Sequence, residues 1–164
     1  MKTLRKIFIL ALMVGAGLSA ADAQATKKDK QAAKIAAIKK SIDTSCYTFV
    51  ADYALPLRGG SRPVDPEYDL RVTKDSVTAY LPYFGEAHFD VPYGASDGGI
   101  KFTSTKFDYK VKNNNKGGWE ITIKPTDVKN MGMLILHISA NGYASLSVNS
   151  ANRDAITFNG HLNE

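Results

Sequence analysis

The sequence predicts an all-β domain, built either as a closed or nearly closed antiparallel barrel or as a sandwich. Three observations lead to this prediction: apolar and polar residues alternate in short runs, there are eight or so such runs, and turn residues separate them. Short connections between many strands are typical of antiparallel barrels and sandwiches. The alternation begins near residue 45, so we place the β domain at residues 44–164.

The first residues have the pattern of an export signal. Three positive charges precede an apolar run at residues 7–16, and small residues then lead to Ala21-Asp22-Ala23. Signal peptidase needs small side chains at such an exit because its pocket admits no larger ones. The apolar stretch is shorter than the ~20 residues that a transmembrane helix needs. We therefore expect residues 1–23 to be a cleaved signal peptide and the mature protein to be periplasmic or secreted, with no membrane span.

Cys46 is the only cysteine of the chain. It lies far beyond the apolar run, so it is not placed to carry the lipid of a lipoprotein. A single cysteine also excludes an internal disulfide. We expect Cys46 to be a small core residue where the first strand starts.

The segment 24–43, between the signal and the β domain, favours helix. It is rich in alanine and lysine, and residues 26–42 contain no glycine or proline. Ile35, Ile38 and Ile42 contribute to a weak apolar stripe near helical spacing. The segment is therefore either a helix packed across a mouth of the barrel or a frayed leader, and the stripe favours the helix.

The first strands are predicted at residues 46–55, 69–74 and 76–83, the last two as a hairpin. The apolar or aromatic positions that share one face of the first strand are Tyr47, Phe49, Ala51 and Tyr53.

A second group of strands follows. Residues 100–112 have the pattern of one long strand, and the Asn- and Gly-rich residues 113–118 form a turn because both residue types tolerate positive φ. In the next strand Trp119, Ile121 and Ile123 face inward. Further strands are predicted at residues 133–139, 143–148 and 155–161.

Two long loops interrupt this pattern, at residues 56–66 and 86–99. Loops of this length without regular structure are uncommon in compact domains and are often functional. The first loop carries Arg58 and Arg62, which could fix an anionic group, and aromatic residues beside His88 could stack on sugars or flat apolar ligands. Ordinary packing of these rings at a barrel rim explains them as well, and the residues alone favour that explanation.

Five segments have a specific pattern rather than a merely biased composition. They are ADYALPLRGGSR (51–62), DPEYDL (65–70), AYLPYFG (79–85), DGGIKF (97–102) and NRDAITFNG (152–160). In these segments the chain resembles the domain of unknown function 4251 family of exported bacterial proteins. The resemblance covers about residues 47–160 and implies an all-β, lipocalin-like barrel, here of about eight strands. It implies no activity and no catalytic residues, because the family is uncharacterised.

The common catalytic and metal-binding motifs are missing from the sequence. There is no Cys-x-x-Cys, His-Glu-x-x-His or Gly-x-Ser-x-Gly. His88, His137 and His161 share no ligand spacing, so we expect no metal and no cofactor. A glycosidase would need two facing carboxylates, which sequence cannot show. A hydrolase of glycans or esters using Asp52, Asp65 or His88 is the weakest alternative.

The composition narrows the class of partner. The formal net charge is +5 at pH 7, and a mildly basic exported protein has an anionic glycan or lipid headgroup as a more natural counterpart than nucleic acid. We expect a non-enzymatic envelope protein that binds a small-molecule, lipid or glycan ligand through loops at a barrel mouth. The candidate ligand-binding residues are Arg58, Arg62, Tyr80, Tyr83, His88 and Tyr93. A protein–protein interaction or inhibitor module, docking an envelope protein through the same loops, is the alternative.

Overall fold

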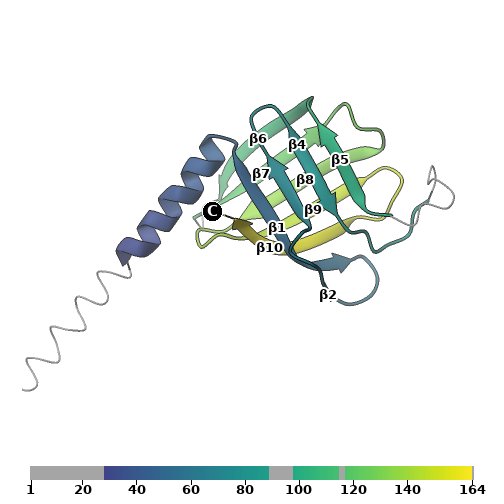
Figure 1. Cartoon of the computed structure of the whole chain (residues 1–164), viewed down its shortest axis with the longest axis horizontal. Helices are drawn as coiled ribbons and strands as arrows, with labels where there is room; N and C mark the ends of the chain where they lie inside the picture. The colour runs from purple at the N-terminus through teal and green to yellow at the C-terminus, as the bar shows by residue number, and fades with distance from the viewer. Residues whose placement is uncertain (1–27, 89–97, 115–116, 164) are drawn as a thin grey trace, which may run out of the picture.

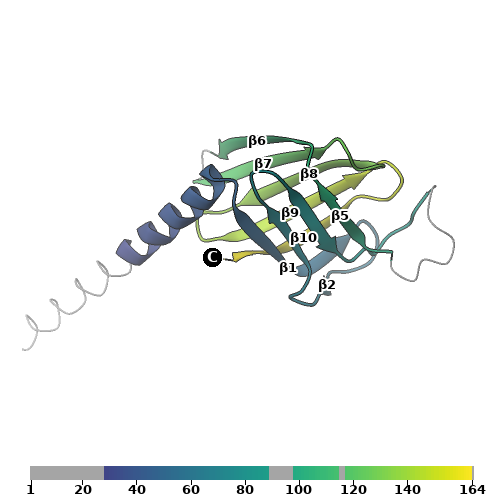
Figure 2. The same cartoon turned by 45° about the horizontal axis from the view of Figure 1, so that its top comes forward.

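The computed structural model describes residues 28–88, 98–114 and 117–163. In this part of the chain one helix (residues 28–43) precedes ten strands that form a single antiparallel sheet. The strands are β1 (Tyr47–Pro56), β2 (Arg62–Pro63), β3 (Asp69–Val72), β4 (Val77–Leu81), β5 (Ile100–Ser104), β6 (Phe107–Asn114), β7 (Gly118–Pro125), β8 (Met131–Ile138), β9 (Tyr143–Ser150) and β10 (Ile156–Asn163). The sheet curls into a nearly closed barrel of nine strands, and β2 lies beside β1 (Figures 1 and 2). The predicted all-β barrel behind an N-terminal helix is confirmed.

Strand β1 is an interior strand of the sheet, whose order is β5-β4-β3-β1-β10-β9-β8-β7-β6. One edge of β1 pairs with β10 over almost its full length. Its other edge pairs first with β3 and then with the short β2. Strands β5 and β6 stand at the two ends of this order, so the seam of the barrel lies between them.

Strand β5 ends at Ser104 and β6 begins at Phe107, on the other side of the seam. The expectation of one continuous strand over residues 100–112 is therefore wrong. The carboxylate of Asp127 accepts hydrogen bonds from the Ser104 hydroxyl and from the backbone N–H groups of Thr105 and Lys106. These bonds, led by the one from Ser104, lower the pKa of Asp127 to about 2. A side chain from beyond β7 therefore fixes the corner between β5 and β6, and we call it the Asp127 corner.

A β-bulge in β1 changes which residues face the core. The register with β10 shifts between Ala51 and Tyr53, so the alternation resumes one position late. Ala54 is buried, whereas Tyr53 is 50% exposed on the outer face. The expectation that Tyr53 shares the inner face with Phe49 is therefore wrong, because simple period-two counting does not register the extra residue.

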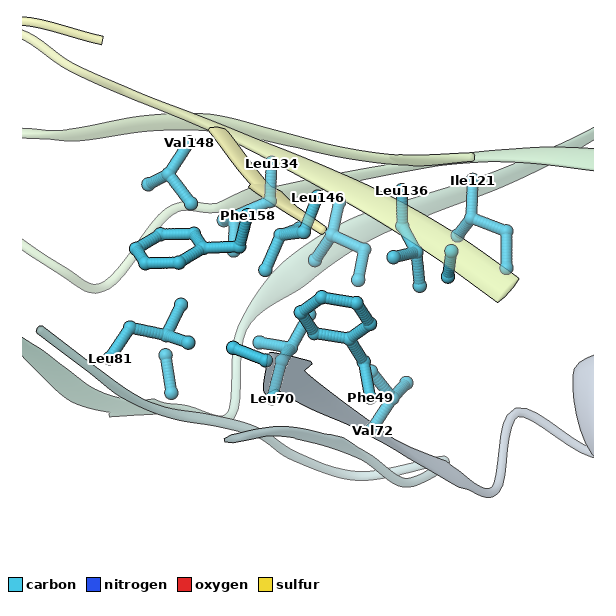
Figure 3. Close-up of a cluster of buried hydrophobic side chains, with 14 of the residues drawn as sticks. Phe49, Leu70, Val72, Leu81, Ile121, Leu134, Leu136, Leu146, Val148 and Phe158 are labelled. Atoms are coloured by element: carbon cyan, nitrogen blue, oxygen red, sulfur yellow. The ribbon is translucent and has the colours of Figure 1, made fainter. Parts of the chain in front are cut away.

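Apolar side chains from both sides of the barrel fill its interior. Phe49 and Phe158 are fully buried and lie between the two sides, among leucine and valine side chains (Figure 3). Ile121 and Ile123 are buried as predicted. The interior is therefore a packed hydrophobic core.

The helix packs its C-terminal half on this core. Ile38 and Ile42 are each 1% exposed and belong to the same cluster of buried residues as the barrel. The helix lies against one end of the barrel (Figure 1), as the apolar stripe indicates. Among the described residues, no helix is long and apolar enough to cross a membrane.

Cys46 lies directly before β1 and is exposed, so its expected place in the core is wrong. The buried positions of the strand begin one residue later, at Tyr47.

Candidate functional site

Two loops at one end of the barrel are joined by backbone hydrogen bonds. The N–H of His88 donates to the carbonyl of Asn152 at 2.8 Å, and the N–H of Asp154 donates to the carbonyl of Glu86 at 3.1 Å. Between these two bonds, Ala87 and Arg153 form an isolated antiparallel bridge. The segment after β4 is thereby fixed to the β9–β10 connection as a miniature ladder.

Tyr83 lies at the centre of this junction. Its hydroxyl lies 2.9 Å from the carbonyl oxygen of Glu86 and 3.1 Å from that of Asp154, so its single proton is shared between them. Gly85 permits this approach, because a Cβ there would lie 2.6 Å from the hydroxyl oxygen. Burial raises the pKa of Tyr83, and the Asp154 carboxylate raises it further. The phenol therefore stays protonated at neutral pH and serves as a donor.

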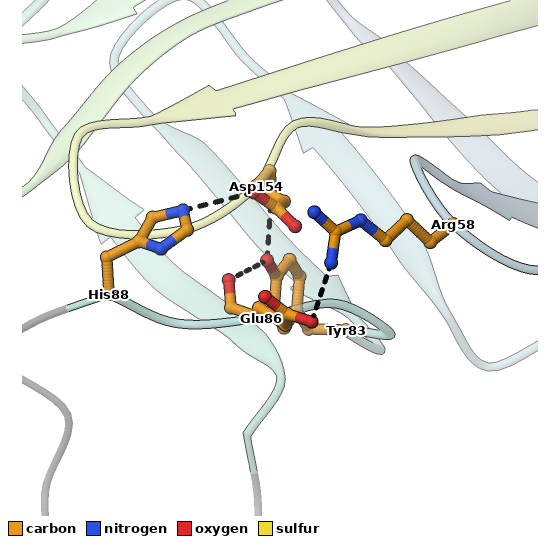
Figure 4. Close-up of polar contacts among 5 residues, drawn as sticks. All are labelled: Arg58, Tyr83, Glu86, His88 and Asp154. Carbon is orange, nitrogen blue, oxygen red and sulfur yellow. Dashed lines mark hydrogen bonds and ion pairs between the residues drawn. The ribbon is translucent and has the colours of Figure 1, made fainter.

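Charged side chains surround Tyr83 (Figure 4). The His88 imidazole donates Nε2–H to Oδ1 of Asp154 over 3.0 Å. On the other side, the Arg58 guanidinium lies 3.0 Å from the Glu86 carboxylate, with the two side chains 76% and 65% exposed. The junction is thus a compact set of paired charges around one tyrosine.

A pocket of about 250 Å³ opens beside the junction, and we call it the loop pocket. Its lining residues are Arg58, Arg62, Phe84, Gly85, Glu86 and Asp154. The Arg62 guanidinium lies 5.2 Å from the centroid of the Phe84 ring, in cation–π contact. Two guanidinium groups and two carboxylates therefore line one small space.

The structure gathers four of the six predicted site residues. Arg58 and Arg62 line the loop pocket, and Tyr83 and His88 belong to the junction beside it. Tyr80 does not join them: it stacks on Tyr68 with ring centroids 5.2 Å apart. Tyr93 lies outside the described residues.

The sequence did not point to Asp154, the residue that holds the junction together. It is 66 positions from its partner His88, and no local pattern links such distant residues. Glu86 starts the second long loop, and its charge is opposite to that of Arg58 and Arg62 on the first, which is the one sequence signal that could have linked them. In the ranges the structure covers, no group of three or more His, Cys, Asp or Glu side chains could hold a metal ion.

The fold and the site define a small, nearly closed β-barrel protein whose polar loops meet at one end. The chain belongs to the family described as domain of unknown function (DUF4251), whose profile matches residues 29–162, and this confirms the resemblance seen in the sequence. A crystal structure of a DUF4251 family protein from Bacteroides eggerthii is similar, with a TM-score of 0.61 and 17% identity over 80% of this chain and 90% of that chain. At this identity the likeness shows the fold alone. No curated protein matches the chain.

Proposed function

We propose that this protein is an exported, non-enzymatic binding protein whose loop pocket takes a small ligand with an anionic group. The proposal rests on the contacts of the Arg62 side chain. Its guanidinium is held against the Phe84 ring, yet within the described residues it makes no hydrogen bond. A carboxylate or phosphate group fits the fork of N–H donors of such an arginine in a bidentate manner.

The filled interior supports binding on the outside of the barrel. The inward-facing side chains, including Phe49 and Phe158, are fully buried and packed together. A ligand inside the barrel would have to displace them, at a cost of several kcal/mol for each large side chain. The loops therefore suit a ligand better than the barrel interior does.

The ion pair of Arg58 is suited to exchange. Arg58 and Glu86 are both more than half exposed, so their attraction is screened by water and contributes little stability. An incoming anion can replace Glu86 as the partner of Arg58 while it also binds Arg62. With about 250 Å³, the loop pocket accommodates the charged end of a ligand and leaves the remainder in solvent.

Removal of the Arg62 side chain tests this proposal. We would isolate the parent protein, Arg62→Ala and Arg71→Ala from the native host and measure their intact masses by native mass spectrometry. Arg71 is a matched control, because it is an exposed arginine that pairs with Asp69 on β3. We expect an additional mass on the parent and on Arg71→Ala that is lost from Arg62→Ala.

The intact mass in the same spectra also identifies the first residue of the mature chain. A chain that starts at Gln24 supports export with cleavage after Ala23, whereas a chain that retains residues 1–23 contradicts it. A bare mass for the parent, or a bound mass that Arg62→Ala retains, contradicts ligand binding at the loop pocket. A stoichiometric protein bound to the parent would favour the interaction or inhibitor module instead.

The hydrolase alternative gains no support from the contacts of Asp52 and His88, two of its three candidate residues. Asp52 pairs with His161, at 3.0 Å, and His88 pairs with Asp154. The described contacts do not join Asp52 to His88, so each of the two belongs to a separate pair.

A further inference from the structure

The outer face of the barrel carries a second concave surface, larger than the loop pocket. Its volume is about 560 Å³, which is within the usual range for ligand clefts. Residues of β1, β6, β7, β8, β9 and β10 line it, and none of them lines the loop pocket. We call it the tyrosine cleft, after Tyr53 and Tyr143.

The two tyrosines are unusually exposed for large apolar side chains, at 50% for Tyr53 and 67% for Tyr143. The bulge in β1 turns Tyr53 outward, and Tyr143 starts β9 opposite His161 of β10. Because β1 and β9 both pair with β10, their backbones lie about 10 Å apart. Tyr53 is opposite Asn159 and Tyr143 is opposite His161, so the two tyrosines are also offset by two residues along the sheet, and their Cα atoms are about 12 Å apart. An oligosaccharide of three or four sugar rings is long enough to contact both.

A row of polar side chains crosses the sheet beside the rings. Tyr53 pairs with Asn159, Asn159 with Ser145, and Ser145 with His137. An amide, a hydroxyl and an imidazole supply both donors and acceptors, which is the mixture that sugar hydroxyls require.

The cleft carries little net charge. Asp52 and His137 are the carboxylate and the imidazole of its lining. Asp52 is paired with His161, and Nδ1 of His137 lies 3.7 Å from the Glu120 carboxylate, with both partners just outside the lining. A strongly charged ligand would find no matching charge here, unlike in the loop pocket. A neutral ligand with flat apolar faces and polar edges fits better.

We propose that the tyrosine cleft binds a neutral oligosaccharide. The C–H faces of two pyranose rings pack on Tyr53 and Tyr143, and the sugar hydroxyls hydrogen-bond to Asn159, Ser145 and His137. The site is independent of the loop pocket, so each can be tested while the other is left intact.

Fluorescence of a tryptophan in the cleft lining can be used to measure this binding. Trp119 is the only tryptophan, and it lines the cleft while packing against the core. We would titrate the purified protein with tetrasaccharides of β-1,4-glucose, α-1,4-glucose, β-1,4-N-acetylglucosamine and β-1,4-xylose, and follow Trp119 fluorescence. We expect a saturable change with at least one of these probes.

Variants then locate the binding. Tyr53→Ala and Tyr143→Ala should each weaken the affinity about tenfold or more, because each removes a stacking platform. Tyr53→Phe and Tyr143→Phe keep the rings and should remain within about twofold of the parent, as should Arg62→Ala in the loop pocket. Both tyrosines are exposed, so none of these changes threatens the fold.

Two results would overturn the proposal. The first is the lack of a saturable change with all four probes. The second is an affinity that neither tyrosine-to-alanine variant alters, because the sugar would then bind elsewhere. Loss of binding in Arg62→Ala alone would place the sugar in the loop pocket and refute the tyrosine cleft.

Discussion

At the scale of single residues, Gly160 permits the close approach of β10 to the bulged strand β1. A Cβ added at this position would lie 1.9 Å from the carbonyl oxygen of Val50 and 3.0 Å from the ring of Phe49. Both neighbours are fixed, one by the backbone and the other by the core. The strands can therefore keep this distance only when residue 160 lacks a side chain.

We predict that Gly160→Ala lowers the free energy of unfolding by about 1–3 kcal/mol, because β10 must move away from β1 to admit the methyl group. Urea denaturation measures this loss. Gly60→Ala is the matched control, since a Cβ there meets nothing within 4 Å. Equal stability of the two variants would contradict the tight contact between β1 and β10.

At the scale of elements, the Asp127 corner fixes the turn between two strands that do not pair with each other. Strands β5 and β6 are not neighbours in the sheet, yet they follow each other along the chain. The Asp127 carboxylate holds the turn between them through the Ser104 hydroxyl and two backbone N–H groups. Its ionised form is therefore the one that stabilises the barrel seam.

The pH dependence of stability follows from this. Because the pKa of Asp127 is lowered from 3.8 to about 2 on folding, its contribution is complete above about pH 4 and is lost as the pH falls toward 2. Asp127→Asn should be less stable than the parent at pH 6, and the two should converge at pH 2. Urea denaturation across this range measures both stabilities.

Asp108→Asn is the control for the seam, because Asp108 is an exposed carboxylate on β6. Its stability should follow that of the parent over the whole pH range. A constant difference between Asp127→Asn and the parent from pH 6 to pH 2 would mean that the carboxylate charge has no part in holding the corner.

The strands that could be predicted from sequence are those in which local alternation and burial agree. The residues of β7 alternate without interruption, and Ile121 and Ile123 are inward as expected. In β1 the bulge adds one residue, and in the stretch 100–112 a distant aspartate breaks the strand. Neither the bulge nor the strand break can be detected from the alternation of apolar and polar residues in the local sequence.

The candidate site was partly predictable, because some of its residues stand out in the local sequence. Arg58, Arg62 and His88 stand out in the two long loops and Tyr83 at the end of a predicted strand, and the fold brings them near one another. Asp154, which joins them, follows β9 and becomes their neighbour only when the barrel closes. The tyrosine cleft was missed because it depends on the outward turn of Tyr53 at the bulge.

At the scale of the whole molecule, the helix and the barrel share one hydrophobic core. Ile38 and Ile42 are as deeply buried as the strand residues they contact. A small domain with one core usually unfolds in a single cooperative step. The helix therefore should not melt separately from the barrel.

We predict that Ile38→Ala lowers the free energy of unfolding by about 2–5 kcal/mol, through loss of buried methyl groups and a residual cavity. Far-ultraviolet circular dichroism follows the helix, and Trp119 fluorescence follows the barrel. Both midpoints should shift together, and exposed Gln31→Ala should shift neither. A dichroism midpoint that falls while the fluorescence midpoint stays would show the helix to be an independent appendage.

The pairing of β1 with β10 sets the order of events when the chain is made. Asp52 and His161, whose side chains form a hydrogen bond across these strands, are separated by 109 positions. Strand β1 therefore keeps one edge uncovered until β10 has been synthesised. The barrel cannot close before β10 has been synthesised, and contacts this distant in the sequence make folding slow. An unfolded chain with this uncovered edge is suited to a chaperone that shields β1 until β10 pairs with it.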